Sequence, residues 1–127
     1  MKDYKKYFIL EASPEDVYNA LTNPFAIKLW TNEEAVMRVE PESEFSIMGG
    51  AIVGRNISFI TNKQLVQEWY FGEQKEQSIV TITLHEHKKG CSVQLQHTNI
   101  PEEDYEDMII GWNDVYFGNL MEFFNGV

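Results

Sequence analysis

The sequence lacks the features that mark several classes of protein. It has a single cysteine, Cys91, so an internal disulfide is excluded. No apolar run approaches the roughly 20 residues that a membrane-spanning helix requires. The first residues carry a basic patch but no apolar core with a cleavage site, so no secretory signal is expected. Together these absences predict a cytoplasmic protein.

Positive charge is also scarce. The 127 residues contain 10 Lys and Arg against 20 Asp and Glu, which gives a formal net charge of −10. Binding to nucleic acid or to an anionic membrane surface requires clustered Lys and Arg, so neither partner is expected. The acidic balance is typical of a well-solvated surface, and it also fits a basic protein partner or a cationic ligand.

Motifs for catalysis and for metal binding are missing as well. There is no nucleophile elbow, phosphate-binding loop or metal motif, and Gly49-Gly50 is expected to be a hairpin turn. His85 and His87 share a strand face, but His97 falls roughly 16 Å away along the sheet and does not complete a zinc site. We therefore expect no metal and no cofactor, and we expect Cys91 to be a buried, unreactive thiol.

What is present suffices for one domain with one core. Hydrophobic residues make up 43% of the chain, as in ordinary globular proteins, so residues 1–127 are expected to form a single domain. A strand is expected from Lys5 to Leu10. A short helix then starts at Pro14, with Ser13 as its N-cap. A second helical turn is expected within residues 25–30, with three apolar anchors: Phe25, Leu29 and Trp30.

From residue 35 onward the pattern changes to short strands separated by turns. The expected strands are Ala35 to Glu40, Glu44 to Met48, Ala51 to Ile60, Gln64 to Phe71, Ser78 to His87 and Cys91 to Thr98. The register of the last two follows from their alternation. A tight turn at Lys88-Lys89 sets Leu84 opposite Val93 and Ile82 opposite Leu95, so the apolar residues share one face. Such a one-sided sheet needs a cover.

The long helical pattern from Pro101 to Phe124 is expected to provide that cover. One apolar stripe should face the sheet: Tyr105, Ile109, Trp112, Tyr116, Leu120 and Phe123. A second stripe should pack against residues 25–30 or form a self-association surface: Ile110, Phe117, Met121 and Phe124. Gly111 and Gly118 are expected to permit a bend in the helix. The predicted fold class is therefore α+β.

Several segments of the chain resemble one known family. The segments are ASPEDVYNALTNPFAIKLW, FSIMGGAIVG, LVQEWYF, SIVTITLHE and NIPEEDYEDMIIGWNDVYFGNLMEFF. They resemble homologues of the activator of the 90-kDa heat-shock protein (Hsp90) ATPase, within the START-like, birch-pollen-allergen-like superfamily. The most specific match is Ile100-Pro101 followed by Gly111-Trp112, and further landmarks are Trp30, Gly49-Gly50 and Trp69.

The resemblance implies a helix-grip fold, in which a curved antiparallel sheet wraps around the C-terminal helix and leaves an apolar cavity between them. In the eukaryotic activator, such a domain follows a different N-terminal domain, and both contact the chaperone. This chain resembles the second domain standing alone. It shows no counterpart of the Asn- and Trp-rich motif of the first domain, so stimulation of the chaperone ATPase is not expected.

Two functional hypotheses follow. The favoured one is a non-enzymatic module that binds a heat-shock chaperone, or a small apolar ligand in the cavity. The alternative is a small helix-grip enzyme of cyclase or dehydratase type, with Tyr116, Glu68 and His97 as its acting groups. The residues predicted to line the cavity are Trp30, Glu68, Trp69, Phe71, His97, Trp112 and Tyr116. A monomer and a homodimer both remain compatible with the sequence.

The pattern of the strand at residues 64–71 does not decide which of its two faces points towards the core. An inward Glu68, together with Val66 and Tyr70, would make a proton shuttle or a polar ligand anchor. The favoured arrangement instead points Trp69 and Leu65 inward and leaves Glu68 in solvent. Arg55 and Asn56 are further candidates for polar anchors.

Overall fold

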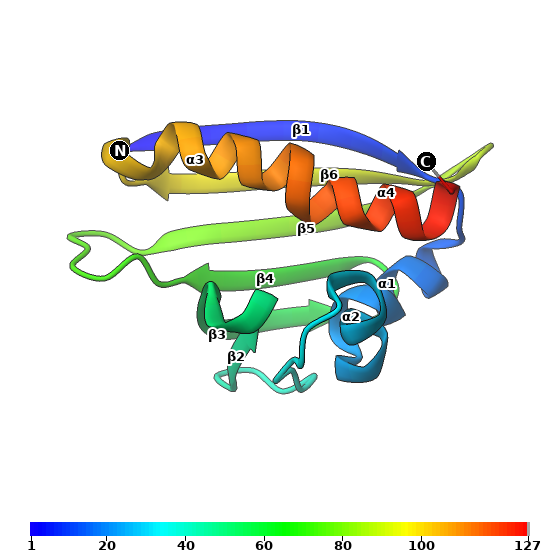
Figure 1. Ribbon diagram of the computed structural model, residues 1–127, viewed down its shortest axis with the longest axis horizontal. Coiled ribbons are helices and arrows are strands. Elements are labelled where there is room, and N and C mark those ends of the chain that lie inside the picture. The colour runs from blue at the N-terminus through cyan, green and yellow to red at the C-terminus, as the bar shows by residue number, and fades with distance from the viewer. Residues whose placement is uncertain (127) are drawn as a thin grey trace.

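The computed structural model describes residues 1–126. Its six strands form one antiparallel sheet in the order β1-β6-β5-β4-β3-β2, seen from top to bottom in Figure 1. The strands are β1 (Lys2–Leu10), β2 (Glu44–Ile47), β3 (Ile52–Ile60), β4 (Gln64–Trp69), β5 (Ser78–His87) and β6 (Gly90–Ile100). This arrangement confirms the predicted α+β helix-grip fold.

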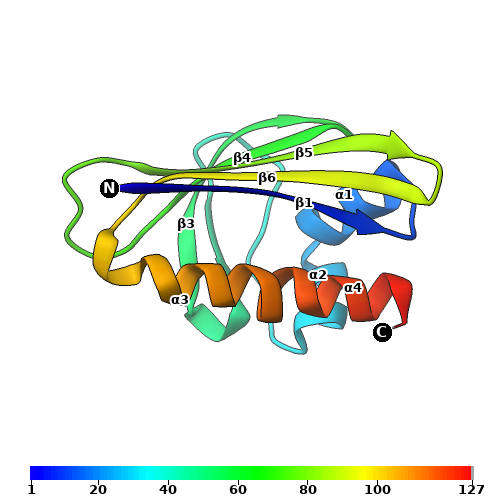
Figure 2. The same ribbon diagram turned by 90° about the horizontal axis from the view of Figure 1, so that it is seen from above.

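The helices lie on one face of the sheet, as the turned view in Figure 2 shows. They are α1 (Pro14–Thr22), α2 (Pro24–Thr31), η2 (Glu102–Asp104), α3 (Tyr105–Ile110), the π-helix η3 (Gly111–Tyr116) and α4 (Phe117–Asn125). A short 3-10 turn, η1 (Met48–Gly50), joins β2 to β3. No helix within residues 1–126 is long and apolar enough to cross a membrane.

Local capping explains the two short helices. The Ser13 hydroxyl accepts a hydrogen bond from the Asp16 amide at 3.1 Å, and Pro14 occupies the first turn of α1. Asn23 ends α1 and caps α2 by accepting from the Phe25 amide at 2.9 Å. The Trp30 indole of α2 then donates to the Ala20 carbonyl of α1 at 2.8 Å, so the two helices are fixed to each other.

The predicted register of β5 and β6 is confirmed. Leu84 pairs with Val93 and Ile82 with Leu95, and all four side chains are buried under the helices. β1 pairs with the other edge of β6, so β6 lies between β1 and β5 in the sheet. Along β4 the buried residues are Leu65, Gln67 and Trp69, so the favoured inward face of that strand is also confirmed.

Two local expectations were wrong. Residues 35–40 are not a strand, because only one bridge, Val36 to Ser46, joins them to the sheet. Phe25 and Leu29 do not anchor α2: their side chains are 81% and 71% exposed. The helix instead buries Ile27 together with Trp30. Because Phe25 and Leu29 lie on the opposite side of the helix from Ile27, they point to solvent.

The C-terminal helix covers the sheet as predicted, but a π-helical segment interrupts it at residues 111–116. A π turn adds one residue, so residues after it rotate by about 100° from their places in a regular α-helix. Phe117, predicted for the second stripe, is therefore buried and stacks on Phe8 of β1 with ring centroids 4.0 Å apart. Phe123, predicted to face the sheet, is 44% exposed. The sequence did not predict this contact of Phe117 with β1.

Candidate functional site

Six of the residues predicted to line a cavity meet between the sheet and the C-terminal helix. They arrive from β4, the segment after it, β6, η3 and α2, and we call them the aromatic–histidine cluster: Trp30, Trp69, Phe71, His97, Trp112 and Tyr116. Trp69 stacks on Trp112 with ring centroids 4.6 Å apart, and Trp112 lies 4.7 Å from Tyr116. These contacts fill the space in which the family resemblance implied a cavity.

His97 is the polar centre of this cluster. Its side chain is fully buried, and the Trp112 indole N–H donates to its Nδ1 at 3.0 Å. Its Nε2 lies 2.7 Å from the Ser78 hydroxyl, which in turn donates to the Thr98 carbonyl at 3.2 Å. Because an indole can only donate, Nδ1 is the acceptor and the proton sits on Nε2. Every polar atom of the imidazole is thus paired.

The protonation state of His97 follows from this burial. Removal from water lowers its pKa to about 4, and the carboxylate of Asp3 opposes the shift only weakly. The imidazole is therefore neutral at pH 7, with both nitrogens already engaged. In this arrangement it has no free lone pair with which to act as a general base.

A second buried polar chain starts at the other tryptophan. The Trp69 indole donates to Gln67 Oε1 at 3.1 Å, and Gln67 Nε2 donates to Asn56 Oδ1 at 2.9 Å. Asn56 then donates to the Ser43 hydroxyl at 3.1 Å. This chain ties β4 to β3 and to the loop before β2. Asn56 was a candidate polar anchor, and it is fully buried.

Sequence reasoning missed Ser78 and Gln67 as parts of this site. Gln67 carried a usable signal, because it alternates with Leu65 and Trp69 and so had to share their inward face. Ser78 carried none, since a serine at the first position of a strand is as common on the solvent side.

The other titratable groups of the interior are held in their neutral forms. Burial raises the pKa of the Tyr116 phenol well above its usual range, and the hydroxyl stays protonated. Burial also raises the pKa of the Cys91 thiol, which is fully covered. Neither side chain presents a nucleophile to solvent.

Glu68 stands apart from the cluster. It lies on the outer face of the sheet, where its carboxylate accepts from Arg55 Nε at 2.7 Å. Arg55 also forms a two-pronged contact with Glu42, with both distances 2.9 Å. Glu68 and Arg55 were candidate polar groups of the cavity. The pleat directs both side chains away from the helices, which for Glu68 is the favoured arrangement of β4. Of the three groups invoked for catalysis, only His97 and Tyr116 share the interior.

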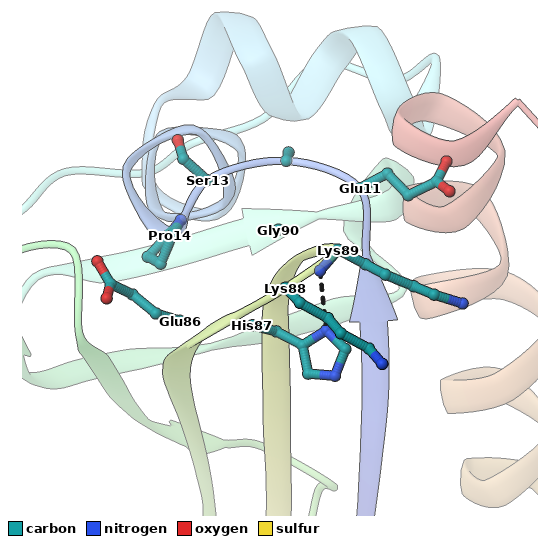
Figure 3. Close-up of a pocket in the computed structure, with 9 residues that line it drawn as sticks. Glu11, Ser13, Pro14, Glu86, His87, Lys88, Lys89 and Gly90 are labelled. Carbon is teal, nitrogen blue, oxygen red and sulfur yellow. Dashed lines mark hydrogen bonds between the residues drawn. The ribbon is translucent and has the colours of Figure 1, made fainter.

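The surface carries shallow hollows instead. One of about 640 Å³ lies where the β5–β6 hairpin passes the start of α1, as Figure 3 shows. Lys88 and Lys89 line it together with Glu11 and Glu86, so its charges largely offset one another. None of the residues predicted for the site lines this hollow. Within residues 1–126, no group of three His, Cys, Asp or Glu side chains is placed to hold a metal ion.

Comparison with known proteins shows to which family this chain belongs. The model of the family described as activator of Hsp90 ATPase homolog 1-like protein matches residues 11–125. The mouse activator of 90 kDa heat shock protein ATPase homolog 2 is 21% identical over 88% of this chain. This chain covers 34% of that protein, so it spans about a third of the length of the curated relative.

Solved structures agree with the fold. An HSP90 activator from Plasmodium falciparum superposes with a TM-score of 0.77 at 20% identity, covering 93% of this chain and 97% of that one. The Aha1 dimer from Colwellia psychrerythraea superposes with a TM-score of 0.80 at 20% identity, covering 96% and 95%. The family match spans nearly the whole chain, and this chain belongs to the family of activator of Hsp90 ATPase homolog 1-like proteins.

Proposed function

We propose that this chain is a non-enzymatic, single-domain protein-binding module whose partner is a heat-shock chaperone of the Hsp90 type. The observation that carries this proposal is the filled interior. Trp69, Trp112 and Tyr116 occupy the space that would otherwise receive a ligand, so recognition falls to the outer surface. The sequence-based expectation of a cytoplasmic location fits such a partner.

The names of two relatives suggest which partner this chain binds. One similar structure is named an HSP90 activator, and the mouse relative is named an activator of the 90 kDa heat shock protein ATPase. Because this chain spans about a third of the mouse protein, we propose that it binds the chaperone. Stimulation of the ATPase is not part of the proposed function, because this chain covers only 34% of the mouse protein.

The packing of the interior argues against the two other functions considered, binding of a small apolar ligand and catalysis of cyclase type. A small apolar ligand would have to displace aromatic side chains that are already in van der Waals contact. An enzyme of cyclase type would need its acid and base in one accessible pocket, yet Glu68 lies on the far face of the sheet from His97 and Tyr116. His97 is moreover paired at both nitrogens.

Calorimetric titration of the purified chain into the Hsp90-type chaperone of its source organism tests the proposal. We expect a saturable complex with a Kd in the micromolar range, about −8 kcal/mol, and no change in the chaperone's ATPase rate. An unrelated protein of matched size and net charge serves as the control for non-specific attraction. Absence of a complex at about 100 µM, where a micromolar Kd would give near-saturation, would refute chaperone binding.

A further inference from the structure

Apolar side chains of α2 and α4 are left uncovered by the rest of the described residues 1–126. Phe25 and Leu29 are four residues apart on α2 and therefore share one face of that helix. They are 81% and 71% exposed, and Phe123 of α4 is 44% exposed. Leu29 and Phe123 line a common hollow of about 300 Å³ together with Trp30, Asn119 and Glu122. We call Phe25, Leu29, Glu122 and Phe123 the α2–α4 patch.

The exposure of this patch follows from two features of the fold. α2 buries Ile27 and Trp30, so the face that carries Phe25 and Leu29 must point outward. The π turn at residues 111–116 rotates α4 and moves Phe123 from the sheet to the flank beside α2. Single exposed apolar residues are common, but neighbouring ones from two elements around a hollow are typical of an interaction site.

Charge indicates what kind of molecule covers the patch. The helix α4 carries no Lys, Arg or His, and Glu122 is its one acidic residue. Glu122 lines the hollow and forms no ion pair with any residue in the described range 1–126. On α2, the charge of Lys28 is already offset by Glu34. The patch thus has exposed apolar side chains and one negative charge, that of Glu122, at its border.

A second copy of this chain is a poor occupant for such a surface. A two-fold interface places the same patch on both sides, so each negative border would face its own copy. The formal net charge of −10 adds long-range repulsion to that contact. A partner with Lys or Arg beside its apolar side chains would instead gain attraction at the border and burial at the centre.

We propose that the α2–α4 patch binds an amphipathic, positively charged segment of the partner protein. Apolar side chains of that segment pack on Leu29 and Phe123, and a Lys or Arg enters the hollow between them to pair with Glu122. This inference rests on the proposed protein-binding function and adds the surface and the chemistry of the partner.

The first experiment maps the surface with a defined probe. A synthetic amphipathic helical peptide of Leu and Lys is titrated into the ¹⁵N-labelled chain, and a peptide with Glu in place of Lys is the control. We expect amide shifts concentrated in residues 24–31 and 117–125 with the Lys peptide and none with the Glu peptide. Shifts centred on the outer face of the sheet, equal shifts with both peptides, or no shifts would overturn the proposal.

The second experiment uses variants of exposed residues, which are not needed for folding. The double variant Leu29→Ser/Phe123→Ser should bind the chaperone at least about tenfold more weakly, as truncated apolar anchors do. The matched control, Tyr7→Ser/Ile60→Ser, removes two apolar side chains that are about half exposed elsewhere on the surface, and it should bind like the wild type. Glu122→Lys should weaken binding at low salt and lose its effect at high salt.

The binding experiments distinguish failure of the α2–α4 patch from failure of the proposed chaperone binding. If the wild type binds the chaperone and Leu29→Ser/Phe123→Ser binds equally well, the patch is refuted and the proposed function stands. If the wild type does not bind, the proposed function fails, and the peptide titration decides the patch. A homodimer in sedimentation that Leu29→Ser/Phe123→Ser dissolves would show that a second copy covers the patch, and would overturn the choice of partner.

Discussion

At the scale of single residues, His97 shows how a polar group is accommodated in an apolar core. The imidazole lies among Trp69, Trp112 and Phe71, and it receives an indole N–H on one nitrogen and contacts a hydroxyl with the other. Buried polar groups are stabilising only when such partners satisfy them. The neutral imidazole meets this condition, whereas the imidazolium would lose the bond from Trp112 and carry an uncompensated charge.

This arrangement predicts a loss of stability in mild acid. The pKa of His97 is about 4 in the folded chain and about 6.5 when free, so between these values only the unfolded chain binds the proton. The stabilisation is therefore complete above about pH 6.5 and is lost as the pH falls towards 4. The loss reaches roughly 3 kcal/mol. Urea unfolding at a series of pH values measures it.

The control for this prediction is His97→Gln, which keeps a donor and an acceptor but does not titrate. Its stability should vary less with pH than that of the wild type between pH 6.5 and 4.5, whatever its absolute value. Carboxylates contribute equally to both curves and cancel in the difference. Parallel curves for the two proteins would contradict the assignment of this pH dependence to His97.

At the scale of elements, the π-helix is the feature that decides how the C-terminal helix meets the sheet. It lies between Gly111 and Tyr116, where Trp112 inserts into the core and donates to His97. The rotation it introduces brings Phe117 onto Phe8 of β1. Two side chains of the helix, Asn113 and Asn125, also bond to β1, through the Tyr4 hydroxyl and the Ile9 carbonyl.

The two glycines of this helix are predicted to differ in their tolerance of alanine. A Cβ on Gly111 would meet only Met108 Cε, at 3.9 Å, so Gly111→Ala should stabilise the chain by up to about 1 kcal/mol. A Cβ on Gly118 would lie 3.0 Å from the Asn113 carbonyl oxygen of the π turn. Gly118→Ala should therefore give no gain. Equal effects of the two substitutions in urea unfolding would argue against a tight π turn.

At the scale of the whole molecule, the helix-grip architecture is present while its interior is filled. The sheet and the C-terminal helix are arranged as in the similar Hsp90 activator structure. Between them, Trp69 and Trp112 are 2% and 0% exposed and stack on each other. The filled interior is the reason why we propose recognition at the outer surface.

Removal of one tryptophan is predicted to restore that site. Trp69→Ala should cost about 3–5 kcal/mol of stability and leave an apolar cavity with Gln67 Oε1 exposed to it. Indole should refill this cavity and raise the melting temperature of the variant, whereas the wild type should show no shift. Trp69→Leu serves if the alanine variant is too unstable. A shift of the wild type with indole would show that a ligand site exists already.

Several features of this protein depend on neighbouring residues and were therefore predictable from the sequence. Ser13 caps α1, and Asn23 followed by proline separates the two short helices, because these bonds join residues three or fewer positions apart. The register of β5 and β6 follows from strict alternation across a tight turn, since a slip of one residue would bury Gln94 in place of Val93. The family resemblance and the α+β fold rest on the same local patterns.

Only the tertiary structure decided the features on which the proposed function rests. Ser78, His97 and Trp112 meet from β5, β6 and η3, and no local pattern specifies which distant side chains satisfy a buried imidazole. The exposure of Leu29 and the rotation of Phe123 likewise result from competition among apolar side chains for a limited core. Local sequence determined most of the helices and strands. The close packing of these elements determined that the interior is filled and that the α2–α4 patch is left uncovered.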